Sequence, residues 1–148
     1  MAQGGWFAAA LLAFSLMAMA AHAADGKFEA QLIWGTNDAK SPNPKHKPVE
    51  RDVLKVLEAL PLKWTHYYEV NRVAFTVGDG ETKKVAMSEK CTLELKKLKG
   101  NEVELSLYGR GERVERPRIH SLPKEKILVL GGNAPNSTSW LVVLKRIE

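Results

Sequence analysis

Apolar and polar residues alternate along most of the chain after residue 28, and this two-residue period predicts β-strands. The first such run, Phe28–Trp34, places every second side chain on one face, as in a strand with one buried side. The same period returns in the segments 68–77, 85–87, 91–95 and 103–107. Within 68–77 the alternation changes phase, so we expect a bulge or tight bend at Asn71-Arg72 that keeps both apolar sets inside.

Two further runs, Ile127–Leu130 and Leu141–Leu144, are apolar on both faces. This pattern is typical of strands that lie in the middle of a sheet or beneath a helix. A Gly-Gly-Asn turn follows the first run, but a phosphate-binding glycine loop would continue into a helix. The chain continues instead into the β-branched and aromatic run that begins at Trp140, so the sequence predicts a hairpin rather than a nucleotide site.

Among residues 24–148, only the segment 48–60 shows a helical period. Pro48 suits the first turn of a helix, Pro61 ends it, and charged residues occupy the face opposite the apolar stripe. The simplest cover for that stripe is one face of the sheet. The pattern therefore predicts an α+β fold: a mostly antiparallel β-sheet of about seven or eight strands, for which a sandwich is one arrangement, with one amphipathic helix packed on it.

The N-terminal segment resembles a secretory signal. Trp6–Ala21 carries no charge, and small residues at Ala21 and Ala23 fit cleavage after Ala23. We therefore expect a signal peptide at residues 1–23, with an uncleaved anchor as the alternative. The remaining residues 24–148 then form a single β-rich domain without a transmembrane helix, exported to the periplasm or the extracellular space.

Charge narrows the choice of partner only slightly. The chain has 22 Lys and Arg against 17 Asp and Glu, a net charge of +5, and all of these residues follow the expected signal peptide. This balance favours an anionic envelope polymer as partner, although a modest basic excess also serves solubility. Another envelope protein is the other partner class, and nothing in the sequence indicates specific nucleic-acid recognition.

Four arginines cluster within residues 109–118 and form the best candidate surface for an anion or a partner. They are Arg110, Arg113, Arg116 and Arg118. Because two glutamates and Pro117 interrupt them, the segment is equally typical of a charged edge strand that prevents pairing with a neighbouring sheet.

The densest aromatic cluster follows the predicted helix, and its residues Trp64, His66 and Tyr67 are candidates for an aromatic binding surface. Large rings at this position also commonly fill the junction between a helix and a sheet. Alternation sends Tyr67 to the opposite face from His66, so the cluster cannot lie entirely on the surface.

The sequence predicts no catalytic residue, metal or cofactor. The lone Cys91 shares a strand face with Leu93, which predicts a small buried side chain, and the histidines are too scattered for a zinc site. We therefore expect an exported, non-enzymatic binding or structural domain. One alternative is a small hydrolase that assembles distant residues, such as His66 or His120 with Asp38 or Glu69. Another is a subunit of a secretion or adhesion assembly. Asn136 begins an N-glycosylation sequon, which has meaning only in a eukaryotic source.

Overall fold

A computed structural model describes residues 25–41, 43–134 and 138–148 of the chain. The expected signal peptide and Asn136 of the sequon lie outside these residues. Within the described part, no helix is long and apolar enough to cross a membrane.

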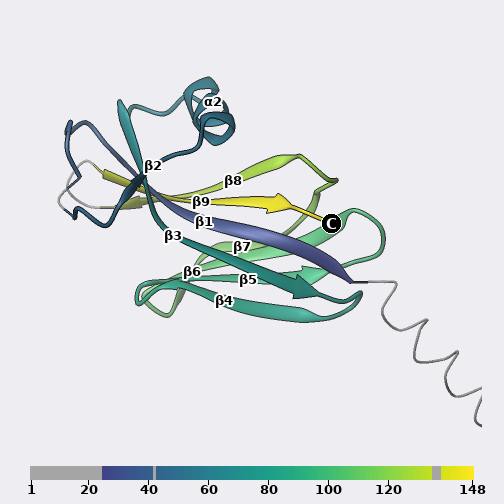
Figure 1. Cartoon of the computed structure of the whole chain (residues 1–148). Helices are drawn as coiled ribbons and strands as arrows, with labels where there is room; N and C mark the ends of the chain where they lie inside the picture. Colours follow the sequence, from purple (N-terminus) through teal and green to yellow (C-terminus); the bar gives the residue numbers. More distant parts are fainter. Residues whose placement is uncertain (1–24, 42, 135–137) are drawn as a thin grey trace, which may run out of the picture.

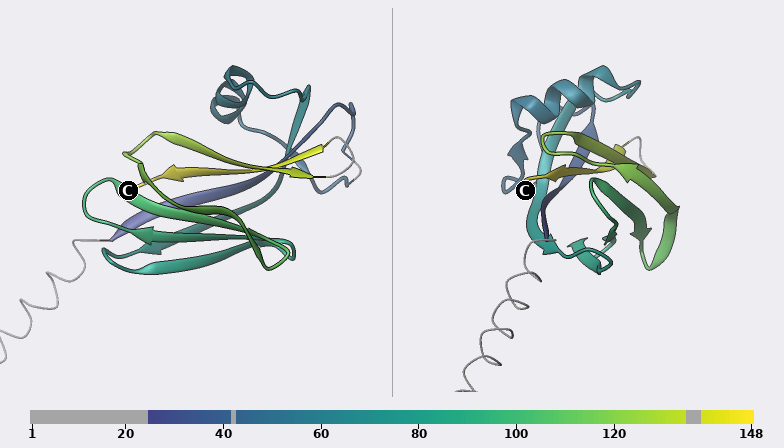
Figure 2. Two further views of the ribbon diagram at one scale, coloured as in Figure 1. Left: turned by 180° about the vertical axis from the view of Figure 1, so that it is seen from behind. Right: turned by 90° about the vertical axis from the view of Figure 1, so that its right-hand side faces the viewer.

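Nine strands of the described residues form two antiparallel sheets, which pack face to face as a sandwich (Figure 1). Sheet A has the strand order β2 (Lys47–Pro48), β3 (His66–Val77), β1 (Gly26–Thr36), β9 (Thr138–Arg146) and β8 (Ile127–Ala134). Sheet B has the order β4 (Thr82–Ser88), β5 (Cys91–Lys97), β6 (Glu102–Gly109) and β7 (Glu112–Ser121). The one helix among the described residues, α2 (Arg51–Ala59), lies on the outer face of sheet A (Figure 2). The expected antiparallel fold with one covering helix is confirmed, in its sandwich form.

The main core fills the space between the two sheets. Phe28 from β1 stacks on Phe75 from β3 with ring centres 5.8 Å apart, and Leu32 lies further along the same face of β1. Sheet B contributes Leu93 and Leu105, which are fully or almost fully buried. Removal of these apolar side chains from water is the main force that holds the sheets together.

A second, smaller core lies between α2 and the outer face of sheet A. Val53 and Leu57 of the helix are fully buried there against Ile33, Leu141 and Val143 of the sheet. This arrangement explains why the run 141–144 is apolar on both faces. Its strand β9 lies between β1 and β8, with the interior of the sandwich on one side and α2 on the other.

The helix is shorter at its start than the sequence predicts. Pro48 pairs with Tyr68 in the two-residue strand β2, so the helix begins only at Arg51. Its end agrees with the prediction, because Leu60 is already extended, as expected for the residue before Pro61. The short β2 also brings the number of strands above the seven or eight expected.

The change of phase within residues 68–77 produces the expected bulge, one residue earlier than predicted. Leu32 pairs with Asn71 and Ile33 with Glu69, which leaves Val70 as the extra residue of β3. Val70 and the later Val73 both pack against the core between the sheets.

Candidate functional site

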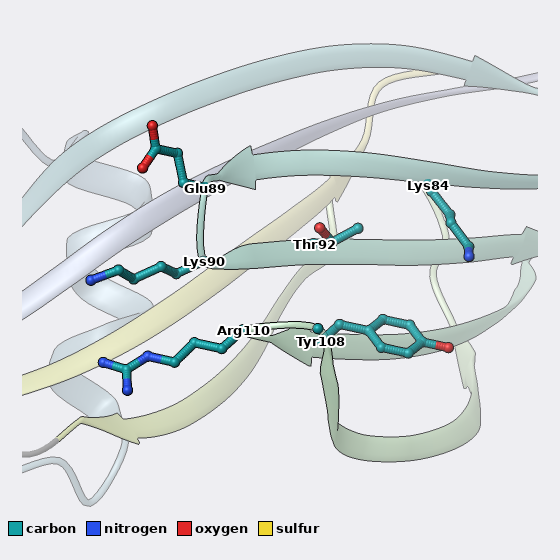
Figure 3. A pocket seen from close by; sticks show the side chains of 7 residues that line it. Lys84, Glu89, Lys90, Thr92, Tyr108 and Arg110 are labelled. Carbon is teal, nitrogen blue, oxygen red and sulfur yellow. The ribbon is translucent and has the colours of Figure 1, made fainter.

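An open hollow of about 310 Å³ lies on sheet B where two neighbouring hairpin turns meet, the β4–β5 turn and the β6–β7 turn (Figure 3). Three cations and one carboxylate line it, together with two neutral polar side chains and a glycine: Lys84, Lys90, Arg110, Glu89, Thr92, Tyr108 and Gly111. The hollow is at the lower end of the range of small-molecule sites, which is about 300–1,000 Å³. Its charge is positive.

The β6–β7 turn places Arg110 at this hollow in an unusual backbone conformation. Gly109 pairs with Glu112, so Arg110 and Gly111 form a two-residue loop with positive φ angles of 54° and 79°. This is the pattern of a type I′ turn, in which Asn or Gly is the usual first residue. The N–H of Arg110 donates a hydrogen bond of 2.9 Å to the carbonyl of Lys90. That bond ties the two turns together, and both basic side chains extend from the same end of the sheet (Figure 3).

Tyr108 is the aromatic centre of the surface and lies between two cations. Its register partners on the neighbouring strands are Thr92 and Arg113. The Arg113 guanidinium lies 5.4 Å from the ring centre and donates a hydrogen bond of 2.9 Å to the phenolic oxygen. On the other side, Lys84 Nζ lies 5.9 Å from the ring centre. Cations at this distance from a ring are attracted by its electron-rich face, so Tyr108 keeps both of them on the outer face of sheet B.

The chemistry of these groups fits an anion. Lysine and arginine side chains are hydrogen-bond donors only, and arginine matches carboxylate, phosphate and sulfate groups with two parallel bonds. The hydrogen bond to Tyr108 raises the pKa of Arg113, which keeps its positive charge. The hollow therefore presents fixed positive charge, with Thr92 as a neutral polar group between the cations.

The four arginines of the predicted anion surface do not share one surface. Arg110 lines the hollow and Arg113 adjoins it through Tyr108. Arg118 pairs with Leu105, a residue that faces the core, and therefore lies on the opposite face of sheet B from Arg113. Arg116 is exposed farther along β7. This strand lies at the edge of sheet B, as expected if the segment is a charged edge strand.

The predicted aromatic surface is divided between different environments. Tyr67 is only 8 % exposed and packs beneath α2, where burial raises its pKa. Trp64 packs against the same cluster and lies over the backbone of Gly35. His66 is half-buried, with its Nδ1 atom 2.9 Å from the hydroxyl of Thr65. For Tyr67 and Trp64 the structure supports the core-packing alternative.

A different aromatic pair, Trp34 and Trp140, was not predicted from the sequence. Their rings stack with centres 6.1 Å apart and an angle of 18° between planes, and Trp140 is 39 % exposed. Local alternation assigned Trp34 to the buried face of the first strand and Trp140 to an apolar run. The available signal was position: Trp34 is the last residue of its run and Trp140 the first residue of its run, so each stands beside a polar loop segment.

Two of the four residues of the hydrolase alternative, Glu69 and His66, have hydrogen-bond partners of their own. Glu69 accepts a hydrogen bond of 2.6 Å from Arg72, and His66 contacts Thr65. In residues 25–41, 43–134 and 138–148, no group of three or more His, Cys, Asp or Glu side chains is arranged to hold a metal ion. Cys91 is partly buried against the main core, and this burial raises its thiol pKa, which makes it a poor nucleophile.

Comparison of the chain with family models, with curated proteins and with solved structures finds no match. The function is therefore inferred from the chemistry of the chain's own side chains.

Proposed function

We propose that the chain is an exported, non-enzymatic binding domain that holds an anionic polymer of the cell envelope or extracellular space on the outer face of sheet B. The observation that carries this proposal is the arrangement around Tyr108, where Lys84 and Arg113 flank one ring beside a hollow lined by Lys90 and Arg110. A polymer suits a surface that is open and extended rather than enclosed.

Export rests on the uncharged segment that precedes the domain and its small residues at Ala21 and Ala23. N-terminal sequencing of the native protein tests this part of the proposal. We expect the mature chain to begin at Ala24 in a fraction outside the cytoplasm. A chain that begins at Met1 or Ala2 in a soluble cytoplasmic fraction would contradict it.

The binding proposal is tested with two double variants that remove the same charge. Arg110→Gln with Arg113→Gln removes two cations at or beside the hollow, whereas Arg116→Gln with Arg118→Gln removes two cations from the same segment outside it. Titration with inorganic polyphosphate and with polygalacturonate gives the affinities. We expect the first variant to weaken binding at least about fivefold and the second less than about twofold, because hydrogen bonds to charged groups contribute about 1.5–3 kcal/mol.

Added salt supplies a second readout, since exposed charges are screened over about 10 Å at 0.1 M ionic strength. Binding by the wild-type chain should weaken steeply with salt, and the variant at the hollow should show a shallower salt dependence. Equal losses in the two double variants would show that only net charge matters. Unchanged binding in both would reject the hollow as the site.

The second candidate, a subunit of a secretion or adhesion assembly, is favoured by the edge strand β7. Val114 and Ile119 of this strand are 50 % and 62 % exposed, although Pro117 lies between them. Capture of envelope components on the mature domain at low and high salt separates the two functions. Capture that survives high salt and is lost in Ile119→Lys would favour the subunit. Capture that disappears at high salt and in the variant at the hollow would favour the polymer-binding domain.

A further inference from the structure

A row of aromatic residues crosses sheet A at one end of the sandwich. Trp34 of β1 pairs directly with Tyr68 of β3 and with Trp140 of β9. Side chains at directly opposite positions of neighbouring strands lie on the same face of a sheet. This is the face that carries Leu32 and Val142, two residues earlier and two residues later in their strands, toward sheet B. The row therefore continues the inner face of sheet A beyond the buried core.

The row is built as a firm platform with one ring open to solvent. Trp34 is held between two neighbours, because Trp140 stacks on it and the ring of His46 contacts it at 78° with centres 6.0 Å apart. Ser41 fixes His46 through a 2.6 Å hydrogen bond, and the hydroxyl of Tyr68 donates to the carbonyl of Ala39. Trp140 at the other side of the stack keeps 39 % of its surface exposed.

The platform lies at the same end of the molecule as the basic hollow. The β4–β5 and β6–β7 turns, the end of β8 and the start of β9 are together at one end in Figure 1, and the view from behind in Figure 2 agrees. The Asn71 side chain of β3 donates a hydrogen bond of 3.0 Å to the carbonyl of Met87 in β4, which fixes how far the two strands are shifted along each other. Asn71 pairs with Leu32, two residues before Trp34, and Met87 is two residues before Glu89 in the β4–β5 turn.

Further positive charge borders the platform itself. His46 follows the exposed Lys45 at the end of a proline-interrupted loop and precedes the exposed Lys47, the first residue of β2. One end of the molecule thus combines an exposed aromatic ring with cations on the loop and cations on the turns of sheet B. Aromatic rings stack on apolar ring faces, and lysine and arginine bind acid groups.

We infer that Trp140 is a stacking site for a sugar ring and that the bound polymer is an acidic polysaccharide. This inference rests on the proposed function, to which it adds the substrate class: the ring face of one sugar packs on Trp140, and acid groups along the polymer meet Lys90 and Arg110. A single-stranded nucleic acid also stacks on aromatic rings, but its phosphates at every nucleotide favour a groove of continuous positive charge. Here Glu89 and Glu94 lie among the cations of sheet B.

The experiment compares three probes: polygalacturonate, inorganic polyphosphate and a single-stranded oligothymidylate. Trp140→Ala removes the stacking ring, Trp140→Phe retains an aromatic face, and Ile147→Ala is the matched control. Ile147 is 42 % exposed and lies next to Lys27 at the start of β1, the strand end opposite Trp34. Titrations with all three probes, and the tryptophan fluorescence of the wild-type chain during them, give the readouts.

We expect Trp140→Ala to weaken binding of polygalacturonate about five- to tenfold, which corresponds to about 1–1.4 kcal/mol for one aromatic contact. Binding of polyphosphate should change less than about twofold, because this polymer offers no ring face. Trp140→Phe should retain most of the affinity for polygalacturonate, and Ile147→Ala should match the wild type. Polygalacturonate, and not polyphosphate, should change the tryptophan emission.

Other outcomes separate this inference from the function on which it rests. If Trp140→Ala leaves polygalacturonate binding unchanged while loss of Arg110 and Arg113 weakens it, the anion-binding function stands and the sugar platform is rejected. If only oligothymidylate depends on Trp140, the ligand is a nucleic acid and the inference is wrong. If Trp140→Ala fails to fold, an unchanged tryptophan emission of the wild-type chain under saturating polygalacturonate rejects it equally.

Discussion

Trp64 packs directly onto the backbone of Gly35, which leaves no room for a side chain between them. A Cβ atom added to Gly35 would lie 2.8 Å from Cδ1 and 3.0 Å from Cγ of the indole. Gly35 is also the register partner of Tyr67, whose ring would come within 3.2 Å of the same atom. The glycine thus allows two large aromatic side chains to lie beneath α2, on the face of the sheet opposite the Trp34–Trp140 stack.

Gly35→Ala is therefore expected to destabilise the domain by about 1–3 kcal/mol, the usual cost of forcing an extra methyl group into a packed site. Urea unfolding at neutral pH measures the change. The control is Gly78→Ala, where the nearest atoms belong to the ends of the Asp25 and Glu81 side chains, 3.0 Å or more away. An equal cost at both positions would contradict the specific role of the contact with Trp64.

The fold followed from the sequence to the extent that it depends on local periodicity. Burial of every second residue is a property of each strand alone, so β1 and β5 were predicted close to their positions. A bulge was predicted for the same reason, at Asn71-Arg72 and thus one residue after its position at Val70, since it changes the phase of a local pattern. The strand β2 escaped prediction because two residues carry no period, and Pro48 favours a helix start as well as an edge strand.

The candidate site was less predictable because it depends on pairing between distant segments. Trp34 and Trp140 meet only through the register of β1 with β9, which no local pattern contains. Likewise, the pairing of β6 with β7 shifts register after Leu105 and again after Leu107. Each shift changes which residues of β7 face the core, so simple alternation could not place its arginines on the correct faces. Of those residues, Arg110 lies at the basic hollow and Arg113 beside it, whereas Arg118 lies on the opposite face of sheet B.

Arg110 is expected to lower the stability of the domain while it serves binding. A residue other than glycine or asparagine in the left-handed region costs about 1–2 kcal/mol, and Arg110 has a φ of 54° in a type I′ turn. Arg110→Asn creates the preferred Asn-Gly pair, so we expect the free energy of unfolding to rise by up to about 1 kcal/mol. The affinity for polyphosphate should fall in the same variant, because a guanidinium at the hollow is lost.

Thermal unfolding and a polyphosphate titration of the same preparation measure the two effects. Arg113→Asn is the comparison, because it removes an arginine beside the hollow that lies outside the turn. It should weaken binding without raising stability. A less stable Arg110→Asn would show that the arginine side chain contributes more to folding than its backbone conformation costs.

The ammonium group of Lys97 is buried at one end of sheet B and pairs with Asp79. The residue is 3 % exposed, and the end of its side chain packs against Gly26. Asp79→Asn leaves this cation without its counter-charge, which is expected to cost about 1–3 kcal/mol. Lys97→Met retains the apolar stem and leaves only the half-exposed carboxylate, so it should cost less. Urea unfolding measures the loss of stability in each variant. A larger loss for Lys97→Met than for Asp79→Asn would contradict this account.

The charged residues that join α2 to sheet A are expected to make stability depend on pH in the acid range. Arg72 donates a 2.5 Å hydrogen bond to Glu50, and Lys145 donates one of 2.7 Å to Asp52. The bond from Arg72 lowers the pKa of Glu50 below its ordinary 4.5, and the bond from Lys145 lowers that of Asp52 below 3.8. Since the folded state binds these protons more weakly, the stabilisation is fully present above the ordinary pKa values. It is lost as the pH falls through the lowered ones.

Glu50→Gln tests this contribution. Because Glu50 is 43 % exposed, we expect a loss of only about 0.5–1 kcal/mol at pH 7, and a difference from the wild type that shrinks as the pH falls below 4.5. Urea unfolding at a series of pH values measures it, with Glu58→Gln on the exposed side of the same helix as the control. If Glu50→Gln and the wild type differ by the same amount at pH 3 and pH 7, the ion pairs with Arg72 and Lys145 do not hold the helix to the sheet. The apolar contacts of Val53 and Leu57 would then account for its position alone.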